Sequence, residues 1–150
     1  MLAAGTRKVA RMTSVAAGAA AFALFSCTEA GPEPFELDPV LVAEGKEIFR
    51  YDTFGDEQYW TDTLRMHEVI DAAVSPRAAL GVGLKVDVDA LPQSVRDALA
   101  AGQIDLDDPA VTVTLLKLNA VVGAQGVVET INGRDTLTRF GITCALCHST

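Results

Sequence analysis

The chain has 150 residues, of which 49% are hydrophobic and 21% charged. This composition is typical of a globular protein and excludes an intrinsically disordered one. The formal net charge of −8 is unevenly distributed, because three of the 12 basic residues precede residue 12 and the first acidic residue is Glu29. After residue 26, 9 basic side chains remain against 20 acidic ones. Such a surface repels nucleic-acid phosphate and anionic lipid, so we expect neither as a partner.

The N-terminal segment has the layout of a bacterial export signal. Basic residues are followed by an apolar run from Val15 to Phe25, the order and length typical of a signal peptide. A single transmembrane helix is the alternative, but the uncharged run from Met12 to Thr28 is slightly short of the roughly 20 residues that a span needs. We therefore expect residues 1–26 to be an export signal.

The end of this run resembles the lipobox of bacterial lipoproteins. Leu24-Phe25-Ser26-Cys27 places a small residue before a cysteine, although Phe25 is larger than is usual at its place. The resemblance implies that Cys27 is lipidated, becomes the mature N-terminus and anchors the protein to a membrane on the periplasmic side. Residues 27–39 would then form a flexible tether. The alternative is cleavage after Ala30, with Cys27 unmodified.

Helix-start signals divide the following part of the chain into short helices. Asp38-Pro39, Ser75-Pro76 and Asp108-Pro109 each combine a capping residue with a proline suited to the first helical position. The apolar periodicity predicts helices over 40–51, 56–74, 92–101 and 109–121, a restart at 76, and an irregular stretch at 84–91.

After residue 123 the pattern becomes that of a β-hairpin. Residues 127–131 and 136–140 are rich in strand-forming side chains and flank Asn132-Gly133, a pair typical of tight hairpin turns. We predict a short two-stranded ribbon in a domain that is otherwise helical. The expected fold class is therefore mainly α.

The strongest indication of a chemical function is the segment Cys144-Ala145-Leu146-Cys147-His148. Positions i, i+3 and i+4 of a helix share one face, so Cys144 and Cys147 can each reach one vinyl group along the same edge of a porphyrin. The imidazole of His148 can then bind the iron. Thr143 is suited to cap this turn. The spacing is that of covalent haem attachment, with Cys144, Cys147 and His148 as cofactor-binding residues and His148 as the metal ligand.

Three other interpretations of these residues are open. A zinc site needs four ligands, and only His67 and Cys27 remain to join the three residues of the motif. A thioredoxin-like cysteine pair is typical of a βαβ context, which the predicted hairpin does not supply. The third is a plain disulfide between Cys144 and Cys147, or a chance match to the motif. We favour haem because all five positions of the motif are present behind an export signal.

The motif resembles the haem site of bacterial c-type cytochromes, and the wider sequence is similar to di-haem cytochrome c peroxidase-like proteins. The segments that carry this likeness are Gly45–Arg50, Asp52–Glu57 with Trp60, Gly83–Pro92 and Gly141–Thr143. The resemblance spans residues 40–150. It implies a cytochrome c-like helical domain that holds haem c covalently and exchanges electrons with redox protein partners in the periplasm.

In most such cytochromes the motif opens the haem domain, whereas only Ser149 and Thr150 follow His148 in this sequence. The resemblance therefore implies that the C-terminal part of the domain is missing, as in a chain truncated just after the motif. The alternative is the four-helix class of cytochromes, whose motif lies near the C-terminus. Against it, the residues before Cys144 have a hairpin pattern instead of that of a long final helix.

Other residues of the mature chain are candidates for a site or for the core. Met66 and His67 are of the types that bind haem iron opposite the proximal histidine, but a histidine on an amphipathic helix is more often a surface or satisfied interior residue. Three aromatic residues are expected to pack in the core: Phe49, Phe54 and Trp60.

The acidic pair Asp107-Asp108 fits a helix cap better than a general acid and base, so we expect no catalytic residue there. The favoured function is haem binding and electron transfer. The alternatives are the N-terminal portion of a di-haem peroxidase-like oxidoreductase, and a non-haem structural or binding lipoprotein.

Overall fold

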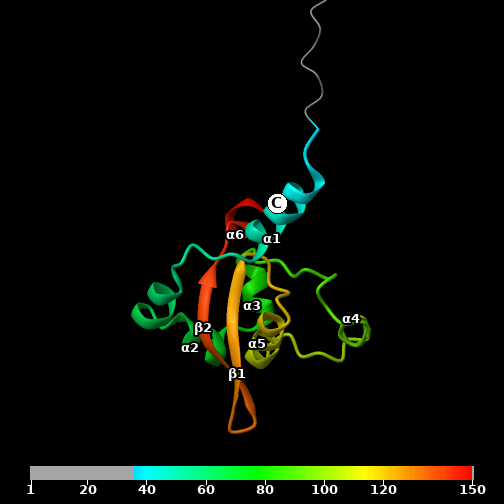
Figure 1. The fold of residues 1–150 in the computed structure, drawn as a ribbon. Coiled ribbons are helices and arrows are strands. Elements are labelled where there is room, and N and C mark those ends of the chain that lie inside the picture. The colour runs from blue at the N-terminus through cyan, green and yellow to red at the C-terminus, as the bar shows by residue number, and fades with distance from the viewer. Residues whose placement is uncertain (1–35, 150) are drawn as a thin grey trace, which may run out of the picture. The chain divides into compact units, whose positions relative to one another are not determined.

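The computed structural model of the protein describes residues 36–149. The predicted export signal, Cys27 and residues 27–35 of the predicted tether lie outside this part. The elements, in chain order, are α1 (Pro39–Tyr51), the π-helical turn η1 (Tyr59–Thr63), α2 (Met66–Ala73), α3 (Pro76–Gly81), α4 (Gln93–Ala100), α5 (Pro109–Lys117), β1 (Ala124–Ile131), β2 (Arg134–Ile142) and α6 (Ala145–His148) (Figure 1). No helix between residues 36 and 149 has the length and hydrophobicity to cross a membrane.

The three predicted helix starts are confirmed. The side chains of Asp38, Ser75 and Asp108 each accept a hydrogen bond from a backbone N–H in the first turn of α1, α3 and α5, and a proline follows each of them. Each side-chain oxygen satisfies an amide that has no partner inside its helix.

β1 and β2 form an antiparallel hairpin around Asn132-Gly133, where both residues have positive φ. Ala124 pairs with Ile142 at the open end, and Ile131 pairs with Arg134 beside the turn. The hairpin lies where the sequence predicted it, but each strand is longer than expected.

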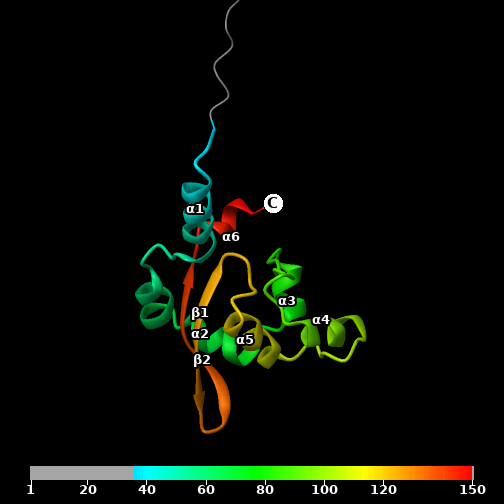
Figure 2. The ribbon, with the colours of Figure 1, turned by 45° about the vertical axis from the view of Figure 1, so that its right-hand side comes forward.

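The expected fold class, mainly α, is wrong, because the fold is mixed α/β with a two-stranded antiparallel sheet. The hairpin is the surface on which η1, α2 and α5 pack, and not an addition to a helical domain. α2 and η1 contact β2, while α5 contacts both strands (Figure 2).

Two glycines explain why the strands were predicted too short. Gly126 and Gly141 resemble strand ends in the sequence, yet both are paired in the sheet. A Cβ atom at Gly126 would lie 2.6 Å from a methyl carbon of Leu137, and one at Gly141 would lie 2.9 Å from side-chain carbons of Thr53 and Glu57. Glycine thus provides room for neighbouring side chains to cross the strands, and does not end them.

Two predicted helices are shorter in the structure because single residues adopt left-handed conformations. Arg65 has φ 53° and separates η1 from α2, so residues 56–74 do not form one helix. Asn119 also has φ 53° and follows the end of α5 at Lys117, four residues before the predicted end. Asparagine tolerates this conformation better than most residues. The chain then turns, and Val121 forms an isolated β-bridge with Val86.

The core lies between the hairpin, α2 and α5. Leu137 and Val113 are each only 1% exposed. Phe140 contacts the Trp60 indole edge to face, with ring centroids 6.4 Å apart. The other buried hydrophobic residues of this core are Ile70, Leu91, Leu115, Leu116, Ala120, Val121 and Ala124.

We expect Leu137→Ala to lower the free energy of unfolding by about 2–5 kcal/mol, because it opens a cavity at the centre of the core. Val127→Ala on the partner strand is the control: Val127 is 48% exposed, so its truncation should cost about 1 kcal/mol or less. Urea denaturation measures both losses, and equal losses would contradict the central position of Leu137.

Candidate functional site

α6 carries the predicted motif, and Thr143 fixes the start of this helix. Thr143 is 1% exposed. Its amide donates to the Gly123 carbonyl (3.1 Å) and its hydroxyl donates to the Arg50 carbonyl (3.3 Å). The hydroxyl oxygen also accepts from the Ala145 amide at 3.3 Å. The N-cap position of α6 is Cys144, which makes no side-chain capping bond, and Thr143 acts from one residue earlier through its bond with the Ala145 amide. The same side chain joins the turn to α1.

Gly123 brings the loop before β1 into direct contact with α6. Its φ is +85°, and a Cβ atom at this position would lie 2.2 Å from the Leu146 Cα. Ala145, one residue earlier, is 1% exposed. At the other end of the turn, the Lys85 ammonium donates to the Ser149 carbonyl at 2.6 Å. The backbone of the motif is therefore fixed by the Gly123 loop at one end and by Lys85 at the other.

The reactive side chains of the motif are accessible, in contrast to its backbone. Cys144 is half-buried, Cys147 is exposed, and no disulfide joins them. His148 is exposed, and its amide donates to the Cys144 carbonyl at 3.3 Å, which closes the helical turn. Two unpaired thiols at positions i and i+3, followed by an imidazole, are the donor set that covalent haem attachment uses. The residues present fit haem c.

A closed zinc site is not formed by the residues that the structure describes. Between residues 36 and 149, no three His, Cys, Asp or Glu side chains are grouped as they would be around a metal ion. Cys27, the remaining candidate ligand, lies outside this range.

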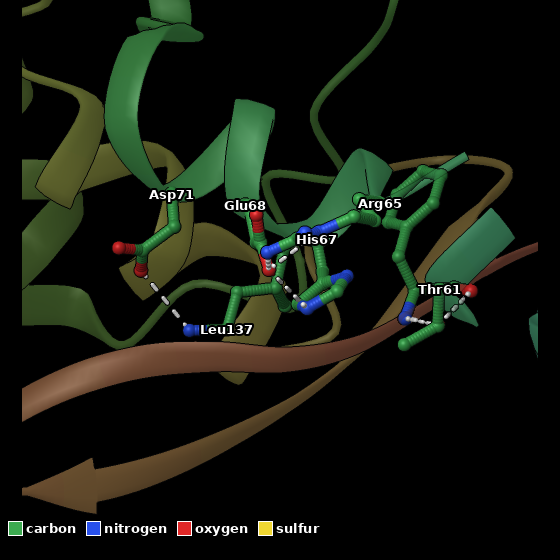
Figure 3. Close-up of polar contacts among 7 residues, drawn as sticks. Thr61, Arg65, His67, Glu68, Asp71 and Leu137 are labelled. Carbon is green, nitrogen blue, oxygen red and sulfur yellow. Dashed lines mark hydrogen bonds and ion pairs between the residues drawn. The ribbon is translucent and has the colours of Figure 1, made fainter. Parts of the chain in front are cut away.

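His67 and Met66 lie far from the motif, at the start of α2. α2 crosses β2 near Leu137, whose amide donates to the Asp71 carboxylate at 3.0 Å, and His67 Nε2 is 3.8 Å from the Glu68 carboxylate (Figure 3). Extended chain rises about 3.3 Å per residue, so Leu137 is about 20 Å from the start of the motif turn. Met66 packs against the core. The structure does not bring either residue to α6.

The aromatic residues divide into two groups. Trp60 is partly buried against Phe140, as predicted, and its indole N–H donates to Asp56 at 2.6 Å. The expectation for the other two is wrong: Phe49 is 37% exposed and Phe54 is 65% exposed. For Phe49 the reason is that α1 contains no buried residue, so its apolar side chains are not covered by the rest of the described chain. Phe54 lies after the end of α1, in the segment that leads to η1.

The predicted helix cap is confirmed at the second residue of the acidic pair. The Asp108 carboxylate accepts from the Ala110 amide at 2.9 Å and caps α5. The Asp107 carboxylate pairs with Arg77 at 2.7 Å.

Sequence reasoning missed the contribution of Arg50. Its guanidinium donates to the Val121 carbonyl (3.2 Å) and to the Asp87 carboxylate (3.3 Å), while its own carbonyl accepts from Thr143. These partners are 37 to 93 residues away in the chain, and no local pattern marks them. Arg50 thereby connects the end of α1 to Asp87, to Val121 before β1 and to Thr143 at the start of the motif turn.

A second pair of side chains stabilises the segment next to the start of the motif turn. The Thr53 hydroxyl donates to the Glu57 carboxylate, and this hydrogen bond lowers the pKa of Glu57 below its ordinary value. Thr53 also forms a β-bridge with Thr143. The charged form of Glu57 thus stabilises a segment that adjoins the start of the motif.

The chain was compared with protein-family models, with curated proteins and with solved structures, and no match was found. The functional interpretation therefore depends on the motif and on the geometry around it.

We expect Gly123→Ala to destabilise the fold more than Gly133→Ala does. Both glycines have positive φ, +85° and +79°, but only the Cβ at position 123 would meet another part of the chain. The steric overlap should add about 1–3 kcal/mol to the loss in the free energy of unfolding. Urea denaturation of the two variants makes the comparison, and equal losses would show that α6 does not press on Gly123.

We also expect Glu57→Gln to flatten the acid side of the stability profile. Because the pKa of Glu57 is lowered in the folded state from 4.5, its stabilising contribution is present above that unfolded value and is lost as the pH falls through the folded value. Thermal denaturation between neutral and acidic pH measures the slope. Thr53→Val removes the hydrogen-bond donor and should flatten the profile in the same way; an unchanged slope in both variants would contradict the assignment.

Proposed function

We propose that this protein binds haem c covalently through Cys144 and Cys147, with His148 as the proximal iron ligand, and that it transfers electrons. The observation that carries the proposal is the arrangement of α6. The two thiols and the imidazole are accessible on one turn, while Thr143 and Ala145, within the same turn, are buried.

The residues have separate tasks in this proposal. Haem iron, when bound, supplies the site that accepts and returns one electron. Cys144 and Cys147 fix the porphyrin through their sulfur atoms, and the exposed imidazole of His148 is the iron ligand. Thr143 and Gly123 hold the turn so that the three side chains keep their spacing. None of the three binding residues has to be uncovered by a rearrangement of the core.

We further propose that the protein faces the periplasm and is anchored by a lipid on Cys27. This follows from the order of basic residues, apolar run and cysteine at the N-terminus. Residues 36–149 contain 18 acidic and 9 basic side chains. That excess supports solubility and suits a redox protein partner with a basic surface.

Expression of the full chain in a bacterium with haem-attachment machinery tests the proposal. We expect the purified protein to be heavier than its amino acids and lipid by one haem, and to show a Soret band. Cys144→Ser combined with Cys147→Ser should remove the covalent haem, because both thioether bonds are lost. Intact-mass spectrometry under denaturing conditions is the measurement.

Leu146→Ala is the matched control, since Leu146 lies on the same turn, is 37% exposed and has no place in the attachment chemistry. It should retain the haem. A wild-type protein without an added porphyrin would overturn the proposal and favour the non-haem lipoprotein.

A further inference from the structure

α1 has a continuous apolar side, here called the α1 face. At 3.6 residues per turn, its five residues fall within about 120° of the helix circumference: Leu41, Val42, Gly45, Ile48 and Phe49. The four charged residues of α1 lie outside this sector. Leu41 is 65% exposed and Ile48 is 56% exposed. An apolar stripe of this width normally packs against another surface, yet α1 contains no buried residue.

The opposite side of α1 faces the domain. Arg50 follows Leu41 by nine residues, about two and a half turns, so its side chain leaves the helix on the other side. The Arg50 guanidinium donates to the Val121 carbonyl at 3.2 Å and to the Asp87 carboxylate at 3.3 Å. In both ribbon views α1 lies at the end of the domain opposite the turn between β1 and β2 (Figures 1 and 2). The α1 face therefore points away from the rest of the described chain.

The chain before α1 limits the distance between this helix and the proposed lipid anchor. Cys27 precedes Pro39 by 12 residues, and a fully extended chain spans at most about 3.6 Å per residue, or about 43 Å over this segment. α1 is thus the first described helix after the anchor. A short tether keeps α1 at a high effective concentration near the membrane, so even a weak apolar contact is formed most of the time.

We propose that the α1 face lies in the surface of a bilayer of net-neutral lipid. The inference rests on the proposed lipidation of Cys27. α1 has 13 residues, which is too short to span a bilayer. An amphipathic helix can instead lie parallel to the membrane and bury its apolar side about 5–10 Å deep at the boundary of headgroups and acyl chains.

Two other occupants of the α1 face are less suitable. Residues 36–51 contain four acidic and two basic side chains, so an anionic bilayer would repel this segment. A second copy of the chain would be repelled more strongly, because each copy carries 18 acidic and 9 basic side chains in residues 36–149. Net-neutral lipid offers an apolar surface without this repulsion.

Quenching of tryptophan fluorescence by brominated lipid tests the contact. The full chain is exported, purified with its lipid and placed in vesicles of phosphatidylcholine with brominated acyl chains. Phe49→Trp adds an indole on the α1 face, and Glu47→Trp adds one on the opposite side of the helix. Both are made with Cys144→Ser and Cys147→Ser, so that no haem absorbs the emission, and the same protein without either tryptophan substitution supplies the background.

Brominated lipid should remove at least about half of the added emission in Phe49→Trp, because the apolar side of an interfacial helix reaches the acyl chains. It should remove little of the added emission in Glu47→Trp.

Hydrogen exchange of the anchored protein in the same vesicles gives a second readout. Leu41→Gln combined with Ile48→Gln makes the α1 face polar without lowering helix propensity appreciably. Amides of α1 should then exchange at least about tenfold faster than in the wild type, because a helix that lipid no longer covers opens more often. Val82→Gln combined with Val88→Gln is the matched control. These valines are 78% and 57% exposed outside α1, and their substitution should leave α1 exchange unchanged.

The outcomes separate the anchor from the α1 face, and none of them depends on haem. A wild type whose mass shows no lipid on Cys27 overturns the proposed anchor and this inference with it. A lipidated protein with equal quenching of both tryptophan variants, and with α1 exchange unchanged by the glutamine pair on α1, overturns the inference and leaves the anchor intact. Protection of α1 that rises with the number of protein copies per vesicle identifies a second copy as the occupant and also overturns the inference.

Discussion

The buried hydroxyl group of Thr143 connects parts of the chain that are distant in sequence. It donates to the carbonyl of Arg50 at the end of α1 and accepts from the Ala145 amide at the start of α6. The amide of the same residue bonds to Gly123, just before β1. A buried donor or acceptor without a partner costs about 1–3 kcal/mol, so these groups constrain one another. The direction in which α6 leaves the hairpin, and with it the place of the motif, depends on this constraint.

The hairpin connects the motif turn to the core. β2 runs from the Asn132-Gly133 turn, past Leu137 at the centre of the core, to Ile142 beside the motif. Helices α2 and α5 pack against the two strands. A site built on a regular element is positioned more accurately than one on a free loop. The proposed attachment of haem would require such accuracy, since two thiols would have to meet two fixed points of one ring.

Local signals made part of this structure predictable from the sequence. The three capping residues before proline, the Asn132-Gly133 turn and the threonine before the motif act on neighbours within a few residues, and each was found where it was expected. The fold class was not predictable in this way, because Gly126 and Gly141 allow contacts across the sheet that no local pattern encodes. The break at Arg65 and the contacts of Arg50 likewise depend on distant partners. Phe49 and Phe54 were misjudged because hydrophobicity alone does not say whether anything covers a side chain.

In the motif turn, the groups that hold the turn in place differ from the groups that we propose to bind haem. Ala145 and Thr143 are buried, whereas Cys147 and His148 are exposed and Cys144 is only partly covered. Exchange of an exposed side chain usually changes stability by about 0.5 kcal/mol or less. Substitutions at the exposed positions of this turn should therefore change the proposed haem binding with little effect on foldability.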